Sequence, residues 1–370
     1  MIVKRLELTN FRNYGNLEVD FSEGTNILSG NNAQGKTNIL EAIFLCGSTK
    51  SHRGAKERDM IRFTENEAHV RIYINRDGVD YKIDYHLSRD KRKGVAIDNT
   101  PVKKYSEIFS LLSVVSFSPE DLSIIKDGPA ARRHFLDMEI CQLDKIYMFN
   151  LANYNKTLQQ RNQILRKSDE AFLSDDLLSV WDDQIVKSGI AIIEIRERFI
   201  NELNEIAKVI HSRLTSGKEE ITLIYEPNVK ASDLEKALKE GKRRDIAAGM
   251  TLSGPHRDDI CFLVKKEGEE PIDVRKFGSQ GQQRTAALTL KLAEIELVKK
   301  KINNNPIILL DDVLSELDRN RQKQLIAGIE GMQTLITCTG LEEFVDSSPG
   351  TTNVFRVENG GISEIANEGQ

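Results

Sequence analysis

Residues 30–38 form a glycine-rich segment of the kind that binds phosphate groups. Gly30 to Thr37 fits the pattern GxxxxGK[ST], whose loop also contains Asn31, Asn32, Ala33, Gln34, Gly35 and Lys36, and Asn38 follows directly. Glycines let successive backbone N–H groups point at a phosphate, Lys36 reaches the outer phosphates, and Thr37 offers a hydroxyl ligand to Mg²⁺. A plain glycine-rich turn is the alternative. A short strand before the loop and an amphipathic helix after it favour a site for ATP instead.

A second set of chemical groups stands at the end of a hydrophobic strand. Ile307 to Leu310 is apolar and is followed by Asp311 and Asp312. P-loop enzymes hold Mg²⁺ with an aspartate placed in this way, so we assign Asp311 to the metal together with Thr37. Asp312 would orient or deprotonate the attacking water, which gives Lys36, Asp311 and Asp312 as the catalytic set. A strand that simply ends in a polar turn is the alternative.

A third motif, Phe277 to Arg284, precedes a predicted helix. It resembles the signature motif LSGGQ of ABC-type ATPases, because Ser279, Gly281 and Gln282 match while Gln280 replaces the first glycine. The resemblance implies that these three residues contact the γ-phosphate of a nucleotide held by another subunit. Exposed N–H groups and the helix dipole favour an anion at such a helix start.

Two shorter segments resemble further parts of the same class. Ser315 to Asp318 resembles the D-loop, and Phe117 to Asp121 occupies the place of the Q-loop, where Glu120 would reach the magnesium shell. Thr337 to Thr339 stands where many ABC proteins carry a histidine, so we do not expect a histidine switch.

The elements that must position these motifs follow from the periodicity of the chain. Apolar alternation predicts strands before residue 30, and strands again over 68–102 with a hairpin turn at Asp77-Gly78. Helical periodicity runs from Gly128 to about Leu214, and α/β character returns after Ser253.

Most of the chain lies between Lys36 and Asp311, which is far more than a compact P-loop domain needs. We therefore predict an α/β fold: an ABC-type, SMC-like P-loop ATPase head with a β-meander subdomain, formed by residues 1–115 and 250–370. An inserted helical lobe would occupy residues 116–249.

Composition narrows the setting of the protein. The 370 residues carry a net charge of −5, which excludes an evenly basic surface but not a local basic groove. The four cysteines form no CxxC pair and the six histidines show no metal-ligand spacing along the sequence. No signal peptide or apolar stretch of roughly 18 residues is evident, so we expect a cytoplasmic protein without a membrane partner.

Taken together, the motifs resemble the RecF family from end to end. The resemblance rests on Leu8 to Tyr14, on the loop GNNAQGKTN, and on four further segments: Phe117 to Leu122, Gly128-Pro129 with Arg132-Arg133, Ser253 to Asp259, and LLDDVLSELD. It implies binding of ATP and DNA, an ATP-dependent homodimer and slow, Mg²⁺-dependent hydrolysis. It also implies action with RecO and RecR to load RecA at gapped DNA in recombinational repair and replication.

Other residues are weaker candidates. Arg12, and the segment Ser51 to Arg53, would reach the nucleotide, although a solvated surface arginine is the alternative. His256, Arg257 and Asp258 favour a structural network over acid–base chemistry. Basic residues that would converge on the phosphates of duplex or junction DNA are Arg89, Lys91, Arg92, Lys103, Lys104, Arg132 and Arg133. Short basic runs more often form solvated faces.

Three other functions remain open from the sequence. One is the ATPase subunit of a transporter, which would need a membrane partner. Another is an SMC-like ATPase with a different effector, and the third is a DNA scaffold that binds ATP without turnover.

Overall fold

The computed structural model describes residues 1–90, 93–103, 106–109, 111–167, 175–339 and 351–365. The chain divides into two compact units, and each is described by itself: unit 1 is Met1–Asp121 with Glu294–Gln370, and unit 2 is Leu122–Ala293. Among the described residues, no helix is both long enough and apolar enough to cross a bilayer.

Unit 1 contains two sheets of six strands each among its described residues. The first is antiparallel, in the order β2-β1-β4-β5-β6-β7. Its strands are β1 (Ile2–Phe11), β2 (Tyr14–Asp20), β4 (Glu67–Arg76), β5 (Val79–Ser88), β6 (Gly94–Ile97) and β7 (Thr100–Pro101). This sheet contains the predicted hairpin, since β4 and β5 are joined at Asp77-Gly78.

The second sheet has the order β15-β14-β3-β13-β12-β8, and its members from β14 to β8 run parallel. Its strands are β3 (Thr25–Ser29), β8 (Val114–Phe117), β12 (Ile307–Asp311), β13 (Thr334–Cys338), β14 (Thr351–Glu358) and β15 (Gly361–Ile365). The central strands β3, β13 and β12 are buried along nearly their whole length, as expected of parallel strands covered on both faces.

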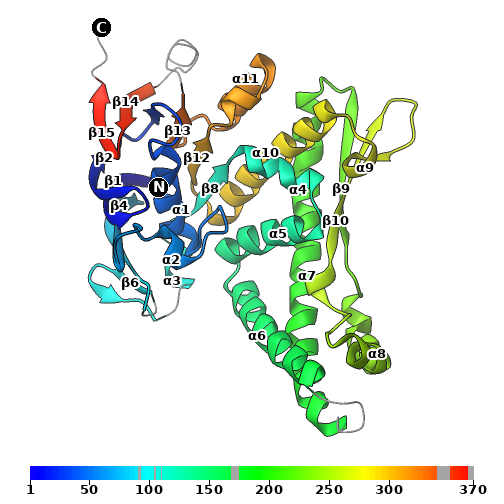
Figure 1. The fold of residues 1–370 in the computed structure, drawn as a ribbon. Helices are drawn as coiled ribbons and strands as arrows, with labels where there is room; N and C mark the ends of the chain where they lie inside the picture. The colour runs from blue at the N-terminus through cyan, green and yellow to red at the C-terminus, as the bar shows by residue number, and fades with distance from the viewer. Residues whose placement is uncertain (91–92, 104–105, 110, 168–174, 340–350, 366–370) are drawn as a thin grey trace. The chain divides into compact units, whose positions relative to one another are not determined.

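Helix α1 (Lys36–Ser48) packs against β4 of the first sheet and against β8, β12 and β13 of the second (Figure 1). Because both faces of the helix meet a sheet, all but two of its residues are buried, including Glu41. The sequence indicates only one apolar face, made by Ile39, Leu40, Ile43 and Phe44. The remaining helical elements of unit 1 are α2 (Glu57–Met60), α3 (Ser106–Phe109), η1 (Pro119–Asp121), η4 (Leu314–Glu316) and α11 (Arg319–Gly328).

Unit 2 is built around the long helix α7 (Asp175–Leu214), which packs against α6 (Lys145–Lys167) and β9 (Glu219–Glu226). The predicted apolar stripe of α7 is its buried side, with Ile185, Ile192 and Leu203 fully covered. The other helical elements are α4 (Leu122–Lys126), α5 (Pro129–Leu143), η2 (Ala231–Asp233), α8 (Leu234–Ala248), η3 (Pro255–Arg257) and α9 (Val274–Phe277). Helix α10 (Gln280–Ile302) contains the boundary between the two units.

Unit 2 also contains a sheet that the helical periodicity did not indicate. Strand β10 (Asp259–Lys266) pairs antiparallel with β9 on one side and with β11 (Ile272–Asp273) on the other (Figure 1). The paired strands belong to unit 2, and that unit also contains the rest of residues 250–293, which we expected in the head. At the first boundary, η1 after β8 stays in unit 1, so that unit extends to Asp121 instead of residue 115.

Candidate nucleotide-binding site

The phosphate loop lies at the carboxyl ends of the parallel strands of unit 1. Strand β3 ends at Ser29, α1 begins at Lys36, and the loop between them holds Gly30 and Gly35 at φ +153° and +114°. Gly30 is packed so closely on β14 that a Cβ atom there would lie 2.3 Å from the carbonyl oxygen of Val357. Gly35 is equally confined, since its Cβ would lie 2.6 Å from the Tyr14 hydroxyl. A backbone oxygen at Gly30 and the side chains of Asn13 and Tyr14 at Gly35 thus occupy the space that a Cβ atom would need.

Side chains outside the motif hold the loop in place. Asn13 donates from Nδ2 to the carbonyl oxygen of Gln34 (3.0 Å) and accepts from Asn38 Nδ2 (2.8 Å). The Gln34 side chain in turn accepts from the backbone N–H of Asn359 at 2.6 Å. Sequence reasoning did not assign Asn13 to the site, because its role depends on the β1–β2 turn lying beside the loop.

Lys36 is folded back along its own loop. Its Nζ donates to the carbonyl oxygens of Gly30 (2.6 Å) and Asn31 (2.9 Å). Burial lowers the pKa of this ammonium below its ordinary value, while the carboxylates of Asp312 and Asp311 oppose the shift. The opposing carboxylates favour the charged ammonium that a phosphate group needs.

Thr37 and Asp311 meet as the sequence predicts. The Thr37 hydroxyl donates to Asp311 Oδ1 at 2.9 Å, and Thr337 donates to the same oxygen at 2.7 Å. Two neighbouring oxygens around an octahedral Mg²⁺ with bonds of 2.0–2.1 Å lie about 2.9 Å apart. The hydroxyl and the carboxylate therefore have the chemistry and the separation of two adjacent Mg²⁺ ligands.

Asp312 adopts the left-handed backbone conformation, with φ +55°. Its N–H donates to the Thr337 hydroxyl at 2.9 Å, which fixes this turn at the end of β12. The left-handed region is uncommon for residues other than glycine, although aspartate tolerates it better than most. Thr337 thus holds the carboxylate of Asp311 and the backbone of Asp312, a role that the sequence did not reveal.

Glu120 lies in η1, directly after β8, and its side chain is exposed. Strand β8 is the parallel neighbour of β12, with Phe117 opposite Leu310, so Glu120 belongs to the same edge of the sheet as Asp311. His52 lies in this region too: burial lowers its pKa, and Glu41, Asp311 and Glu120 oppose that shift.

Arg12 is held by protein groups. Its Nε and one terminal nitrogen donate to the two carboxylate oxygens of Glu41, each at 2.7 Å, and its other terminal nitrogen donates to the carbonyl oxygen of Asp59 at 2.7 Å. The Glu41 side chain is fully buried and also accepts from the Ser51 hydroxyl. Burial acts to raise the pKa of Glu41, but the hydrogen bonds from Arg12 and Ser51 outweigh it, so the pKa is lowered.

The signature-like motif lies in unit 2, at the start of α10. Ser279 accepts from the backbone N–H of Gln282 (3.2 Å), and the Gln282 side chain accepts from the backbone N–H of Ser279 (3.0 Å). This reciprocal pair is a capping box. Ser279 and Gly281 are exposed, and the side chain of the preceding Phe277 is 73% exposed. The helix start is therefore both well formed and accessible.

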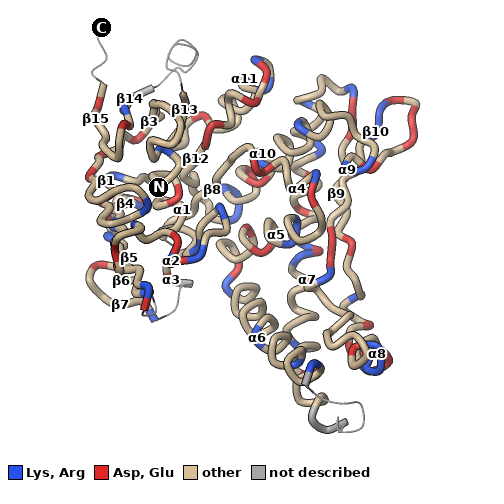
Figure 2. Tube along the Cα trace, viewed as in Figure 1, with Lys and Arg blue, Asp and Glu red and all other residues tan. Residues whose placement is uncertain are grey.

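The predicted DNA contacts occupy different environments. Arg89 and Lys103 are exposed, and Arg133 is half-buried with a terminal nitrogen on the carbonyl oxygen of Asp258. Lys91, Arg92 and Lys104 lie outside the described residues. Basic and acidic positions alternate along many elements, and α8 carries both signs (Figure 2).

Arg132 does not fit the predicted contact with a DNA phosphate. Its side chain is only 4% exposed and is paired with Asp259, and it also donates to the carbonyl oxygens of Ile124 and Asp127. A guanidinium committed in this way serves the core of unit 2, so we remove Arg132 from the DNA-binding set.

His256 and Asp258 belong to a buried network within unit 2. His256 Nε2 faces the carbonyl oxygen of Thr251 (3.0 Å) and therefore donates, so Nδ1 accepts from the Tyr154 hydroxyl (2.6 Å). Burial lowers the pKa of His256 to about 4, which keeps the ring neutral. Asp258 accepts from the buried Arg196 at 2.9 Å. These contacts are those of the structural network that the sequence favoured.

The known proteins to which the chain is similar belong to one family of P-loop ATPases. The family model described as RecF/RecN/SMC N terminal domain matches residues 2–363. The DNA replication and repair protein RecF of Lachnoclostridium phytofermentans is 55% identical over 364 residues, which cover 98% of this chain and all of that protein. The RecF protein of Agathobacter rectalis is 52% identical over 367 residues, 99% of each chain.

Solved structures agree with these matches. The recombination mediator protein RecF of the RecFOR pathway, in its structure with ATP, gives a TM-score of 0.89 at 35% identity, covering 98% of this chain and 97% of that one. An SMC head bound to the C-winged helix domain of ScpA gives 0.56 at 17% identity over 100% of this chain and 98% of that one, a likeness of fold alone. The predicted α/β, SMC-like ATPase head is confirmed.

Proposed function

We propose, because this chain belongs to the RecF family of DNA replication and repair proteins, that it is an ATP-dependent DNA-binding protein of recombinational repair. In this proposal it binds ATP and Mg²⁺, closes as a homodimer on gapped or junction DNA, and helps RecO and RecR to load RecA. Hydrolysis is slow and serves to release the DNA. Such work on DNA would take place in the cytoplasm.

The observation that carries the proposal is the meeting of Thr37 and Asp311 at 2.9 Å beside Lys36. These residues are far apart in the sequence, yet they meet next to the phosphate loop, which supports a cation site there. A bound Mg²⁺ would neutralise charge on the phosphates. Lys36 would exchange its two carbonyl partners for phosphate oxygens, and the N–H groups at the start of α1 would receive the anion.

Asp312 is our candidate for activating water. It follows the metal carboxylate directly, and the contact between its N–H and Thr337 fixes its backbone. In that position its carboxylate would orient the water that attacks the γ-phosphorus and accept its proton, while the bond from that phosphorus to ADP breaks on the opposite side. Glu120, at the same sheet edge, would complete the shell around the cation.

The exposed start of α10 supports a dimer in which each ATP is shared between two subunits. Ser279, Gly281 and Gln282 form a capped helix N-terminus, and the N–H groups there favour an anion such as the γ-phosphate. ATP would then hold the dimer closed, and its hydrolysis would shift the population toward open, DNA-free chains. DNA phosphates would meet Arg89, Lys103 and Arg133.

A measurement of nucleotide binding tests the step on which the rest of the proposal depends. A fluorescent ATP analogue should bind the parent chain in a Mg²⁺-dependent manner, and Lys36→Met should lose most of that binding. Lys50→Met, at an exposed lysine beyond the end of α1, is the matched control and should bind like the parent. Equal affinity of the parent and Lys36→Met would remove the nucleotide site on which the proposal rests.

A further inference from the structure

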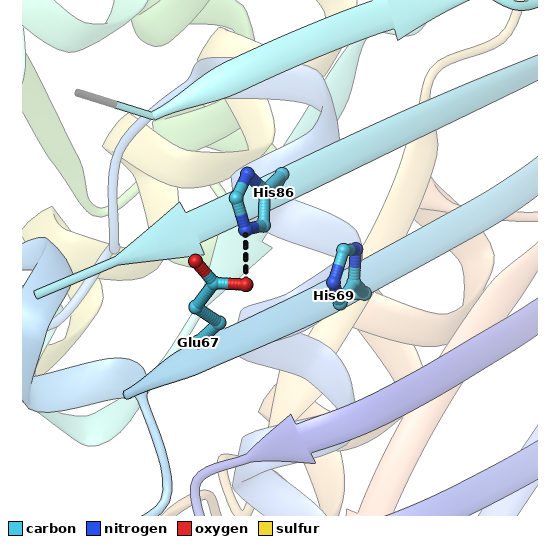
Figure 3. Close-up of side chains that lie close together, drawn as sticks. All are labelled: Glu67, His69 and His86. Atoms are coloured by element: carbon cyan, nitrogen blue, oxygen red, sulfur yellow. Dashed lines mark ion pairs between the residues drawn. The ribbon is translucent and has the colours of Figure 1, made fainter. Parts of the chain in front are cut away.

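Two histidines and a glutamate gather on the exposed face of the antiparallel sheet in unit 1. Glu67 and His69 lie on β4 and His86 lies on β5, and one ligand atom from each falls within 4.8 Å of the others. Figure 3 shows the Glu67 carboxylate turned toward the His86 ring, with His69 on the strand beside it. Ala68 and Val70, which flank His69 along β4, point to the buried face.

Strand register brings the three side chains together. His69 pairs directly with His86 across the two strands, and Glu67 stands two residues before His69 on the same face. The two imidazole rings are stacked, with centroids 4.7 Å apart and planes inclined by 19°. The histidines are distant in sequence, which is why no metal-ligand spacing is visible in the chain.

The surroundings of His69 favour the neutral form of its ring. Burial lowers the pKa of His69, and the neighbouring His86 lowers it further. His86 Nε2 is enclosed and lies 3.2 Å from Glu67 Oε2, but it is not aligned for a hydrogen bond with any described residue. Neutral imidazole nitrogens beside a carboxylate are the form in which histidine binds a metal.

We propose that Glu67, His69 and His86 bind a divalent transition-metal cation of the Zn²⁺ class, with water completing the coordination. In a tetrahedral site with bonds of 2.0–2.1 Å, ligand atoms lie about 3.3 Å apart. The Glu67 and His86 atoms already have this separation, at 3.2 Å. The exposed side chains of His69 and Glu67 need only rotate to close the remaining distance.

The surroundings leave room for the cation. Gly94 stands opposite His86 on β6, and even an added Cβ there would stay 3.9 Å from the His86 Cβ. Arg71, two residues beyond His69 on this face, is paired with Asp84 and with Glu7, so its charge is compensated. Two imidazoles and a carboxylate suit Zn²⁺ and its neighbours, whereas the oxygen ligands Thr37 and Asp311 suit Mg²⁺.

Calorimetric titration of Zn²⁺ into the full chain, with Mg²⁺ in excess to occupy the oxygen site, tests this inference. We expect one Zn²⁺ per chain at micromolar affinity, and His69→Ala and His86→Ala should each weaken binding by at least about tenfold. His134→Ala, an exposed histidine of unit 2, is the matched control and should bind like the parent. Co²⁺ in place of Zn²⁺ should give the visible absorption of a tetrahedral site in the parent and in the control.

Two results would overturn the inference: no saturable binding at micromolar metal, or one-site binding that both cluster variants retain unchanged. The three side chains are on the exposed face, so circular dichroism should report folded variants. Zn²⁺ should also raise the melting temperature of the parent but not of His86→Ala. Binding of ATP by the variants is measured separately, so failure of this site leaves the proposed nucleotide site untouched.

Discussion

Asp312 combines an uncommon backbone conformation with a position next to Asp311, the carboxylate that we propose as a metal ligand. Strained backbone of this kind persists where surrounding contacts enforce it, and here the Thr337 hydroxyl does so. Asparagine keeps the size of the side chain and tolerates the same φ, but it cannot accept a proton. Asp312→Asn should therefore bind ATP like the parent and hydrolyse it at least about a hundredfold more slowly. A phosphate-release assay measures this, and an unchanged rate would exclude Asp312 as the base.

The ion pair between Arg12 and Glu41 allows a structural role of Arg12 to be tested against a contact with the nucleotide. Removing the guanidinium leaves a buried carboxylate with a reduced set of partners, which costs about 3–5 kcal/mol. Arg12→Ala should lower the free energy of unfolding by that amount in urea titration. The exposed Arg53→Ala is the control and should change it by less than about 0.5 kcal/mol. If Arg12→Ala weakens ATP binding without loss of stability, Arg12 contacts the nucleotide instead.

The ion pair between Arg12 and Glu41 also predicts that the free energy of unfolding depends on pH. The pKa of Glu41 is lowered in the folded chain from its ordinary value of 4.5, so the unfolded chain binds this proton more tightly. The stabilisation is therefore complete above pH 4.5 and is lost as the pH falls through the lower, folded value. Unfolding free energies measured from pH 6 downward should fall less steeply for the double variant Arg12→Ala with Glu41→Gln. If the free energies of unfolding of the parent and the double variant fell equally with pH, Glu41 would not be the group responsible.

At the scale of single residues, local motifs predicted only part of the site. Lys36, Thr37 and Asp311 converge because a phosphate loop and the end of a parallel strand share one sheet edge. Asn13 and Thr337 support them through neighbouring turns and strands, which no local pattern reveals. The burial of Arg132 was missed for a similar reason, since its partner Asp259 is far away in sequence.

At the scale of elements, the phosphate loop depends on its contact with β14. Gly30→Ala would place a Cβ 2.3 Å from a backbone oxygen that cannot rotate away, so the loop or the strand must move. We expect loss of ATP binding and destabilisation of about 2 kcal/mol or more. Gly54→Ala is a matched control, because Gly54 also has positive φ (+68°) but meets nothing within 4 Å. If both changes lowered ATP binding and stability equally, the positive φ of the glycine would explain the effect of Gly30→Ala, and the contact with β14 would not.

Element types were predictable where periodicity is strong. The stripe of α7 and the buried strand β12 are both evident in the sequence. Strands β9 and β10 are not, because their pairing gives the sheet its stability and β9 follows a long helical stretch directly. For α1, the sequence indicates one apolar face, whereas packing between two sheets buries nearly the whole helix.

At the scale of the whole molecule, the order of motifs along the sequence indicates a head interrupted by an insertion. The limits of the insertion depend on strand pairing, which the order of motifs does not reveal. Residues 250–293, which include β10 and the signature-like motif, belong to unit 2. In unit 1 the phosphate loop and Asp311 come together, while the exposed start of α10 belongs to unit 2. Because this helix start resembles the ABC signature motif, we propose that it completes the ATP site of a second chain.

Complementation between two variants tests this shared site most directly. Lys36→Met disables the phosphate loop and Ser279→Arg disables the helix start, so a mixed dimer contains one intact site only if the two parts come from different chains. The measurement is the mass of the complex on gapped DNA with ATP, together with phosphate release. Ser232→Arg, an exposed serine in unit 2, should behave like the parent. We predict that each variant alone fails to dimerise and that the mixture recovers dimers and turnover; a mixture no more active than its separate components would contradict the account.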